Sequence, residues 1–360
     1  MDIYVEENID RMDQDQWNAL VQKNAVNTIF QTYAFNRAAQ EVYGRKDGSF
    51  IVCVKDGGEL IAIFPLMLSE LRGKRVLQFI AGERSDYGDI LCSQRREEVL
   101  ELIWQYLFSR RKEWDEIHLS NLPLEASFAT YISKNEILKR LSLRSSQDEA
   151  AYVRLKEDEA YTKSILNKKR VNTYRHSLQK NGSYKVLHLT DPQDIQPYLE
   201  DFFSQHIKRW QGTAYPSLFH DEKNKQFYRR LVQTLPKGWI TFTILQWDNQ
   251  ALAYHFGFTY GKTFIWYKPS YNVAFLKSSP GQVLLQELLE YACAKDFDEF
   301  DFGVGKEAFK YRFSNKIRRN NSFKVFSSRS GYLLHYVPLA LQWRWGKCLS
   351  PLEKFFAKPI

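Results

Sequence analysis

The sequence predicts an α/β (α+β) protein made of two modules of one type, followed by a C-terminal tail. At 360 residues the chain is too long for one average domain and suits two. The expected order of strands and helices in the second half repeats that of the first. Short segments repeat as well, since Trp114–Leu119 matches Phe297–Phe302 at an offset of 183. Gly58–Ala62 likewise resembles Asn249–Ala253 at an offset of 191. This self-similarity indicates a duplication.

We place the N-terminal module at residues 1–148, the C-terminal module at 149–328 and a basic amphipathic tail at 329–360. Each module is expected to hold a mixed, largely antiparallel sheet flanked by helices. In the first module, apolar periodicity and turn signals predict strands at Asp2–Glu6, Ser49–Lys55, Glu59–Leu71, Lys74–Ala81 and Glu116–Leu119, and helices at Gln14–Lys23, Tyr33–Val42 and Glu97–Lys112.

The second module is expected to follow the same order. The predicted strands are Ala150–Leu155, Tyr184–Leu189, Trp239–Trp247, Ala251–Tyr260, Lys262–Lys268, a short strand around Asp301, and Ser322–Phe326. The predicted helices are Tyr161–Lys180, Ile195–Trp210, Lys223–Leu235, a helix that begins at Pro280, and Ala308–Phe313.

The stretch Lys277–Leu285 reads as a loop that turns directly into a helix. Pro280 suits a first helical turn, because its φ is fixed and it has no amide proton. Gly281 has no Cβ, so a ligand can come close to the backbone. Free amides at a helix start, together with the helix dipole, favour a phosphate or pyrophosphate. An ordinary helix start after a turn is the alternative interpretation.

The corresponding stretch of the first module, Cys92–Arg96, has neither Pro nor Gly. We therefore expect one active site per chain, in the second module. There a short strand carries Asp301 on the side opposite to Phe300 and Phe302. A phosphate-binding loop next to this carboxylate indicates catalysis, with Asp301 as the base or as the ligand of an acceptor ammonium. Alternatively, its carboxylate caps the turn at Gly303–Gly305.

Other side chains are weaker candidates. One face of strand Ala251–Tyr260 is small except for His255, so either a packed helix or a ligand can lie against it. His255 is a proton relay or a satisfied core histidine, and Tyr267 and Tyr271 are candidates for protonating a leaving thiolate. Tyr271 is also a substrate-binding candidate. The cationic ones are Lys306 and Lys310, four residues apart on an expected helix, together with Arg209 and the Lys168–Arg170 cluster. These cations suit an anionic acceptor, with ordinary surface positions as the alternative.

Charge and composition narrow the classes of function. Of the net charge of +9, residues 306–360 contribute twelve Lys/Arg against two Glu, and a second basic run covers Lys163–Lys185. Such patches suit phosphorylated ligands, anionic membranes or nucleic acid, or are solvated helix faces. Scattered Cys and His residues predict no metal site, and Gly303-x-Gly305 is too short for a dinucleotide fingerprint. The acidic first residues and the lack of an apolar run of ~20 residues predict a cytoplasmic protein.

Three motifs together resemble the GNAT acyltransferase superfamily: Ser279-Pro280-Gly281, the Phe-Asp-Phe-Gly-x-Gly segment at 300–305, and Phe309–Phe313. The resemblance is closer to acetyltransferases of the cellulose-biosynthesis (CelD/BcsL) type, which are related to FemAB-like tandem-GNAT proteins. It extends over residues 15–326. Further matching segments are Phe30–Thr32, Phe64–Leu66, Ser85–Asp89 and Arg209–Trp210.

The resemblance implies transfer of an acyl group from acetyl-CoA or another acyl-CoA to an amine. The implied acceptor is an amino sugar, or a nucleotide- or lipid-linked sugar, of envelope polysaccharide synthesis. It implies that the strand bearing His255 lines the cleft and that Asp301 and Lys310 lie on the acceptor side. The implied cofactor-binding residues are Ser278, Ser279, Gly281, Gln282 and Val283.

Two other readings remain open. A FemX-like transferase would take its acyl group from aminoacyl-tRNA and bind RNA phosphates with Lys163–Lys185, although the long helical insertion typical of such proteins is not evident. A non-catalytic module of the polysaccharide machinery is the third reading. Outside the tRNA reading we expect no nucleic acid partner. The tail, 331–360, either packs on the protein or contacts the inner face of an anionic membrane.

Overall fold

The computed structural model describes residues 1–44 and 48–334. Within these ranges one sheet of thirteen strands has the order β1-β2-β3-β4-β6-β13-β7-β12-β11-β10-β9-β8, with β5 paired to β3. The strands are β1 (Asp2–Glu6), β2 (Ser49–Asp56), β3 (Glu59–Leu71), β4 (Lys74–Phe79), β5 (Leu91–Cys92), β6 (Glu116–Pro123), β7 (Ser142–Arg154), β8 (Tyr184–Leu189), β9 (Ile240–Trp247), β10 (Gln250–Tyr260), β11 (Thr263–Tyr271), β12 (Glu299–Val304) and β13 (Lys316–Phe326).

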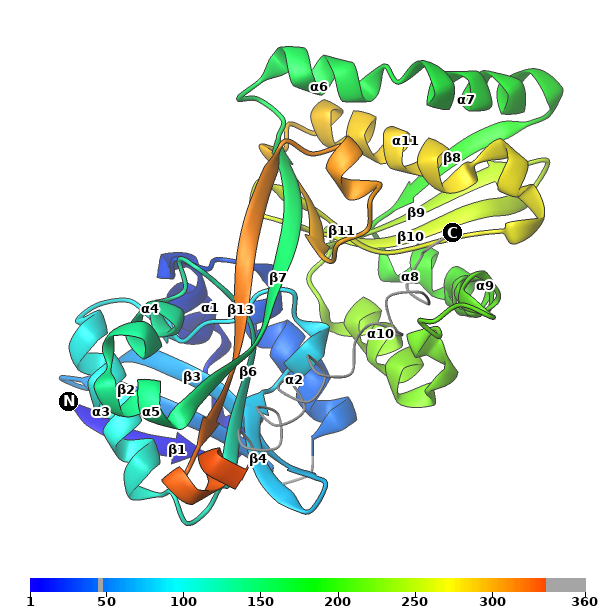
Figure 1. The fold of residues 1–360 in the computed structure, drawn as a ribbon. Coiled ribbons are helices and arrows are strands. Elements are labelled where there is room, and N and C mark those ends of the chain that lie inside the picture. The colour runs from blue at the N-terminus through cyan, green and yellow to red at the C-terminus, as the bar shows by residue number, and fades with distance from the viewer. Residues whose placement is uncertain (45–47, 335–360) are drawn as a thin grey trace, which may run out of the picture.

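Helices cover both faces of this sheet (Figure 1). They are α1 (Gln14–Lys23), α2 (Tyr33–Tyr43), α3 (Arg96–Ser109), α4 (Ser127–Lys134), α5 (Glu136–Leu141), α6 (Glu159–Leu166), α7 (Lys169–Asn181), α8 (Pro192–Ile195), α9 (Leu199–Trp210), α10 (Glu222–Thr234) and α11 (Pro280–Ala294). The predicted α/β class with a large mixed sheet is confirmed. None of the described helices has the length and apolar character needed to cross a bilayer.

The two halves exchange their last strands. In the first half, β6 pairs antiparallel with β13, which comes from the end of the second half. In the second half, β12 pairs antiparallel with β7, which comes from the end of the first half. The strands β7 and β13 also pair with each other and run side by side between the halves (Figure 1). Each half therefore completes the sheet of the other, and the predicted boundary at 148/149 falls inside β7.

The exchanged strands are longer than their sequences suggest. The prediction placed the last strand at Ser322–Phe326, but β13 begins at Lys316. Its first half is mostly polar, and two asparagines at its centre are buried with polar partners. Asn320 is buried and donates to the carbonyl oxygen of Asp86 at 3.0 Å, while Asn321 accepts from Gln147 at 3.2 Å. A hydrophobic pattern cannot reveal a strand of this kind.

Two helix predictions are wrong. The helix expected over Tyr161–Lys180 is two helices, α6 and α7. The side chain of Asn167 bonds back to the carbonyl oxygen of Lys163 at 3.0 Å and ends α6, and Lys168 is extended before α7 begins. The helix expected over Ala308–Phe313 is a single 3-10 turn, η7 (Lys310–Arg312).

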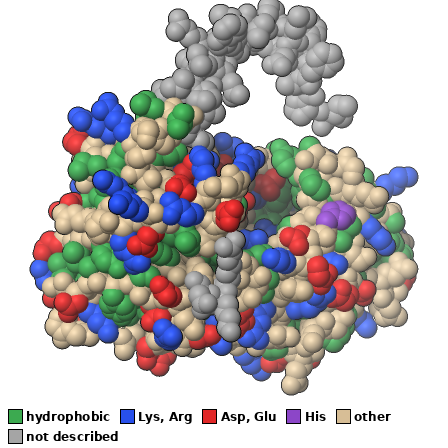
Figure 2. Space-filling model, turned by 90° about the horizontal axis from the view of Figure 1, so that it is seen from below, with side chains coloured by type: hydrophobic (Ala, Val, Ile, Leu, Met, Phe, Trp, Pro, Cys, Tyr) green, Lys and Arg blue, Asp and Glu red, His purple; other side chains and the backbone are tan. Residues whose placement is uncertain are grey.

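The core is shared between the halves. One cluster of buried apolar residues includes members of β2, β3, α2, α9, α10 and β10. Across the junction, Phe35 of α2 makes edge-to-face contacts with Phe227 of α10 and Phe258 of β10, at ring distances of 5.5 and 5.9 Å. A second cluster lies where α11 covers the sheet of the second half. Figure 2 shows the recess that remains between the two halves on one face of the molecule.

The shared core and the exchanged strands predict that neither half folds alone. A fragment of residues 1–148 lacks β13, so β6 becomes an exposed edge and Val325 no longer fills the core. We expect this fragment to aggregate or to lack a cooperative unfolding transition, and the full chain to unfold in one transition. Circular dichroism and light scattering check both. A monomeric fragment with a sharp transition would contradict the shared-core description.

Candidate active site

Two parallel strands diverge at the centre of the second half. The ladder between β11 and β12 holds through Thr263–Glu299, Phe264–Phe300 and Ile265–Asp301, and then stops. Both strands continue past this point, β11 to Tyr271 and β12 to Val304. Among the described residues, the backbone edge of β11 beyond Ile265 therefore has no partner strand on this side. Such an edge suits an extended ligand that carries amide groups.

A cavity of about 570 Å³ lies at this divergence. The helix α11 covers one face of the sheet here and α9 the other (Figure 1). The cavity is lined by Gly281 and Gln282 from the start of α11 and by Arg209 and Trp210 from the end of α9. It therefore extends through the gap between the strands and connects the two faces. This shape allows a donor to enter from one face and an acceptor from the other.

The loop that precedes α11 forms one end of the cavity. Ser279, Pro280, Gly281 and Gln282 all line it, whereas Ser278 does not and Val283 is buried in the core. Ser279 is left-handed (φ 45°) and accepts at its carbonyl oxygen from the N–H groups of Gln282 and Val283. Within the described residues, Gly281 is the position in this turn whose N–H makes no hydrogen bond. The loop therefore offers fewer free N–H groups to a phosphate than the sequence predicts. Pro280 has no N–H, and the N–H groups of Gln282 and Val283 already bond to Ser279.

Gly281 also sets the shape of this end of the cavity. A Cβ at this position would lie 3.0 Å from the Tyr271 ring, so a side chain here has to displace that ring. The rings of Tyr271 and Trp210 form a wall of the cavity here. The guanidinium of Arg209 stacks on this wall, 4.3 Å from the Tyr271 ring and 4.9 Å from the Trp210 ring. Among the described residues Arg209 forms no ion pair, and the buried Trp210 indole N–H has no hydrogen-bond partner. This wall therefore offers unpaired donors to an anionic group.

Asp86, from the loop after β4, reaches the cavity from the first half. Its Oδ2 accepts from the N–H of Val304 at 3.2 Å. Burial raises the pKa of Asp86, and the charge of Asp301 acts in the same direction, while Lys268 and Lys310 partly offset the increase. A half-buried carboxylate with a raised pKa in a cavity is a strong candidate for a general base.

Basic and aromatic groups surround this carboxylate. Lys268 lines the cavity, and burial lowers its pKa. Lys310 is buried, with its Nζ 3.0 Å from the carbonyl oxygen of Val304 and 3.0 Å from Glu307. Tyr267 lies under Lys268, with the ammonium 4.0 Å from the ring centroid, and donates through its hydroxyl to the carbonyl oxygen of Arg84 at 2.7 Å. Burial raises the pKa of Tyr267.

Lys306 does not belong to this group. The sequence analysis placed it on one helical face with Lys310, but residues 305–307 are not helical and Lys306 is exposed. Gly305 donates from its N–H to the carbonyl oxygen of Glu149 at 2.9 Å, which extends the chain where a helix was expected. The Lys168–Arg170 cluster also lies outside the cavity lining, at the start of α7.

Asp301 points away from the large cavity. Phe302 lines that cavity, and because side chains alternate along β12, Asp301 faces the opposite side. There it accepts from the Tyr87 hydroxyl, at 2.8 and 2.7 Å to its two oxygens, and pairs with Arg318 at 3.0 Å. It also accepts from the N–H of Gly303 at 2.7 Å, as in the turn-capping alternative of the sequence analysis. Asp301 and the loop before α11 are thus not brought together.

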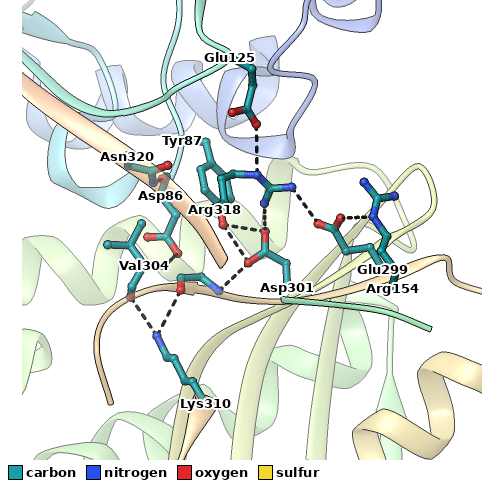
Figure 3. A network of polar contacts seen from close by, with 11 residues as sticks. Asp86, Tyr87, Glu125, Arg154, Glu299, Asp301, Val304, Lys310, Arg318 and Asn320 are labelled. Atoms are coloured by element: carbon teal, nitrogen blue, oxygen red, sulfur yellow. Dashed lines mark hydrogen bonds and ion pairs between the residues drawn. The ribbon is translucent and has the colours of Figure 1, made fainter. Parts of the chain in front are cut away.

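A second cavity, of about 190 Å³, lies on this opposite side. Its charged lining consists of Glu125, Arg154, Glu299, Asp301 and Arg318. Arg318 bridges three of these carboxylates, at 3.3 Å to Glu125, 3.3 Å to Glu299 and 3.0 Å to Asp301 (Figure 3). The charged groups of this cavity therefore form ion pairs largely with one another.

His255 is a core residue. It is fully buried, stacks on Trp266 at 4.7 Å, and its Nε2 accepts from the N–H of Tyr267 at 3.2 Å. Burial lowers its pKa to about 3, so it is neutral. A Cβ at Gly257 would lie 2.0 Å from the imidazole, so the glycine provides the space that this ring fills. The small face of β10 packs against α11, which is the packed-helix alternative of the sequence analysis.

The first half retains the backbone geometry of the loop but not its open space. Arg95 precedes α3 in the left-handed region (φ 49°), as Ser279 precedes α11. Its guanidinium pairs with Asp56 and Glu98, each at 2.7 Å. Acidic side chains therefore occupy the start of α3, where an anion would be repelled.

Comparison with known proteins supports the fold directly. Residues 167–311 match the family model of an acetyltransferase (GNAT) domain. No match was found among curated protein sequences. The chain is similar to the crystal structure of FemX, with a TM-score of 0.64 and 9% identity over 93% of this chain and 99% of that one.

Two further solved structures share the architecture. L-PGS from Bacillus licheniformis superposes with a TM-score of 0.54 at 11% identity, covering 89% of this chain and 96% of that one. A tandem GNAT protein from the clavulanic acid biosynthesis pathway gives 0.52 at 11% identity, covering 91% and 98%. At these identities the likeness concerns the fold, which is of the tandem-GNAT, FemX-like kind.

Because His255 and His206 are buried in their neutral form, we expect the protein to lose stability as the pH falls. The pKa of His255 falls to about 3 on folding, and burial also lowers that of His206 to about 3, from 6.5. The unfolded chain therefore binds protons below pH 6.5 that the folded chain excludes until about pH 3. Each histidine should reduce the unfolding free energy by up to about 1.4 kcal/mol per pH unit across this window.

Denaturant titrations between pH 7.5 and 4.5 measure this loss. His255→Gln and His206→Gln should each have a shallower pH dependence than the wild type, whereas the exposed His220→Gln should match it. An unchanged slope in both buried variants would show that these side chains do not exclude protons in the folded state.

Proposed function

We propose that this protein is an N-acyltransferase whose donor enters from the α11 face and whose acceptor amine reaches Asp86 from the α9 face. One observation carries the proposal: a single cavity connects the loop before α11 with the Asp86 carboxylate through the gap between β11 and β12. The GNAT match over 167–311 supports the reaction class.

In the proposed reaction the acceptor amine attacks the carbonyl carbon of the thioester. The new C–N bond forms as the C–S bond breaks, and the proton of the attacking nitrogen passes to Asp86. A raised pKa suits this step, because it makes the carboxylate a better proton acceptor than an ordinary aspartate. Placing both reactants in one cavity lowers the barrier by ~7–11 kcal/mol through proximity. Lys268 and Lys310 provide positive charge near the reacting atoms.

We propose acetyl-CoA or another acyl-CoA as the donor, with its pyrophosphate at Ser279, Gly281 and Gln282. We propose that the acceptor is an amino sugar, in keeping with the resemblance to the CelD/BcsL type. Two donors support an acceptor that carries phosphate, such as a nucleotide- or lipid-linked sugar. They are Arg209, which forms no ion pair with the described residues, and the Trp210 indole N–H.

A second donor is favoured by one specific observation. Lys169, Arg170 and Lys180 are exposed on α7, which has no acidic residue. This helix contacts the loop before α11, at the donor end of the cavity. An aminoacyl-tRNA would place its acceptor stem on such a face. The single free amide of the loop, at Gly281, is also compatible with a carrier that lacks a pyrophosphate.

Donor binding tests the location of the site. Acetyl-CoA at 100 times its Kd should stabilise the protein by about 2.7 kcal/mol. Gly281→Trp should abolish this shift, because an indole would fill the space beside Tyr271. The matched control is Glu97→Trp, at the same second position of α3. A shift lost in Glu97→Trp and kept in Gly281→Trp would assign the donor to the first half.

Thiol release from acetyl-CoA in the presence of amino sugars tests the base. Asp86→Asn should lower kcat by ~10²–10⁴-fold, the usual contribution of a general base, while leaving the acetyl-CoA shift intact. Ser93→Ala, a hydroxyl outside the cavity, serves as the matched control. A variant Asp86→Asn with wild-type kcat would refute the assignment of Asp86.

Binding of tRNA separates the two donors. If aminoacyl-tRNA is the donor, Lys169→Glu and Arg170→Glu should weaken tRNA binding and each reduce the salt slope by about 1. Lys223→Glu, an exposed lysine of α10 outside the basic run, is the control. Wild-type protein that binds acetyl-CoA and shows no salt-dependent tRNA affinity would rule out the second donor.

A further inference from the structure

Asp86 is held by a bulge in β12. The register between β12 and β7 shifts between Asp301 and Val304, so the peptide of Gly303 leaves the ladder. The Gly303 N–H donates instead to Oδ1 of Asp301 at 2.7 Å. This turns the next N–H, that of Val304, toward the first half, where it donates to Oδ2 of Asp86 at 3.2 Å.

The same aspartate is tied to the residue next to Asp86. Tyr87 donates through its hydroxyl to both oxygens of Asp301, at 2.8 and 2.7 Å. The contacts therefore close a ring, from Asp86 through Val304 and Gly303 to Asp301, then through Tyr87 back along the chain to Asp86 (Figure 3). Two residues of this ring, Asp86 and Tyr87, belong to the first module, and the other three belong to the second.

Two observations show that the ring is tight. Gly303 lies in the left-handed region (φ +67°), and a Cβ there would be 2.3 Å from Oδ2 of Asp86. The carbonyl groups of this turn are also fixed, because the Lys310 ammonium donates to the carbonyl oxygens of Gly303 and Val304 at 3.3 and 3.0 Å. Arg318 then anchors Asp301 from outside at 3.0 Å.

We propose that Asp301, with Tyr87 and Arg318, is a positioning residue for Asp86. Its carboxylate accepts from the Gly303 N–H and so holds the turn that presents the Val304 amide to Asp86. Asp301 acts through the strand from the smaller cavity and touches neither donor nor acceptor. This inference rests on the proposed function, since Asp86 is the base there.

The groups that face Asp86 come from several elements. Lys268 of β11 and Lys310 of η7 favour its ionised form, whereas Asp301 of β12 disfavours it. The remaining titratable neighbours are the hydroxyls of Tyr87, Tyr267 and Tyr228, whose pKa values burial raises, so they stay neutral. Glu307 also lines the cavity, but it pairs with Lys310 at 3.0 Å. Asp301 is therefore the carboxylate whose charge raises the pKa of Asp86, and removing that charge should make Asp86 more acidic.

Asp301→Asn tests the inference because it removes the charge and keeps the shape. We expect the acidic limb of the pH profile of kcat/KM to move to lower pH, by on the order of one unit. We also expect kcat to fall by roughly tenfold or more, because the Val304 amide is less well placed. The KM for acetyl-CoA should not change, since Asp301 does not line the donor cavity.

Glu299→Gln is the matched control. Glu299 faces the same Arg318, at 3.3 Å, and is equally buried, but it contacts neither Gly303 nor Tyr87. This variant should keep the wild-type pH profile even if its stability falls. A merely structural role for Asp301 would give the same profile in both variants, and that result would overturn the inference.

A second readout is independent of activity. In protein labelled with ¹³C-aspartate, the Asp86 carboxyl resonance is identified by its loss in Asp86→Asn. Its titration should shift to lower pH in Asp301→Asn and stay in place in Glu299→Gln. If the wild type transfers no acyl group, the proposed function fails, yet this titration still decides whether Asp301 controls Asp86. An unshifted Asp86 titration in Asp301→Asn would refute that control.

Discussion

The exchange of β7 and β13 is the constraint on which the candidate site depends. Because β13 completes the first half and β7 completes the second, the two halves cannot separate without breaking the pairings β6–β13, β7–β12 and β7–β13. The exchange brings the loop after β4 against the end of β12, and Asn320 of β13 fixes that loop through the carbonyl oxygen of Asp86. The carboxylate of one half is thereby delivered into the cavity of the other.

The candidate site also needs a passage through the sheet, and the divergence of β11 and β12 provides it. A continued ladder past Ile265 and Asp301 would have closed the gap. Instead, the bulge at Gly303 turns β12 toward the first half, and the space is lined by Trp266, Tyr267 and Phe302. The cavity therefore lies where the β11–β12 ladder ends, and the bulge beside it supplies the amide that holds Asp86.

Sequence patterns predicted the fold class, the duplication and most strands and helices, because these follow from apolar periodicity and turn residues. They also identified Gly281, Arg209, Tyr267, Tyr271 and Lys310, which the structure brings to one cavity. They missed Asp86 as a site residue, although Ser85–Asp89 is one of the segments that carry the family resemblance. Its role depends on contact with Val304, 218 positions away. No local pattern encodes that contact.

The misplacement of Asp301 has a physical cause. Alternation along the strand correctly separated Asp301 from Phe300 and Phe302, but it could not tell which side faces the cavity. The helix predicted to carry Lys306 does not form for a related reason. The Gly305 N–H donates instead to the carbonyl oxygen of Glu149 in the exchanged strand β7. In both cases the deciding partner comes from the other half of the chain.

The most direct test of this account is a crystal structure of the protein with a thioether analogue of acetyl-CoA, which cannot transfer its acyl group. The account predicts the pantetheine chain between β11 and β12, the phosphates beside Gly281, and the terminal acyl carbon within reach of Asp86 from the α9 side. An analogue bound at the start of α3, or one lying along α11 with the gap between the strands closed, would contradict it.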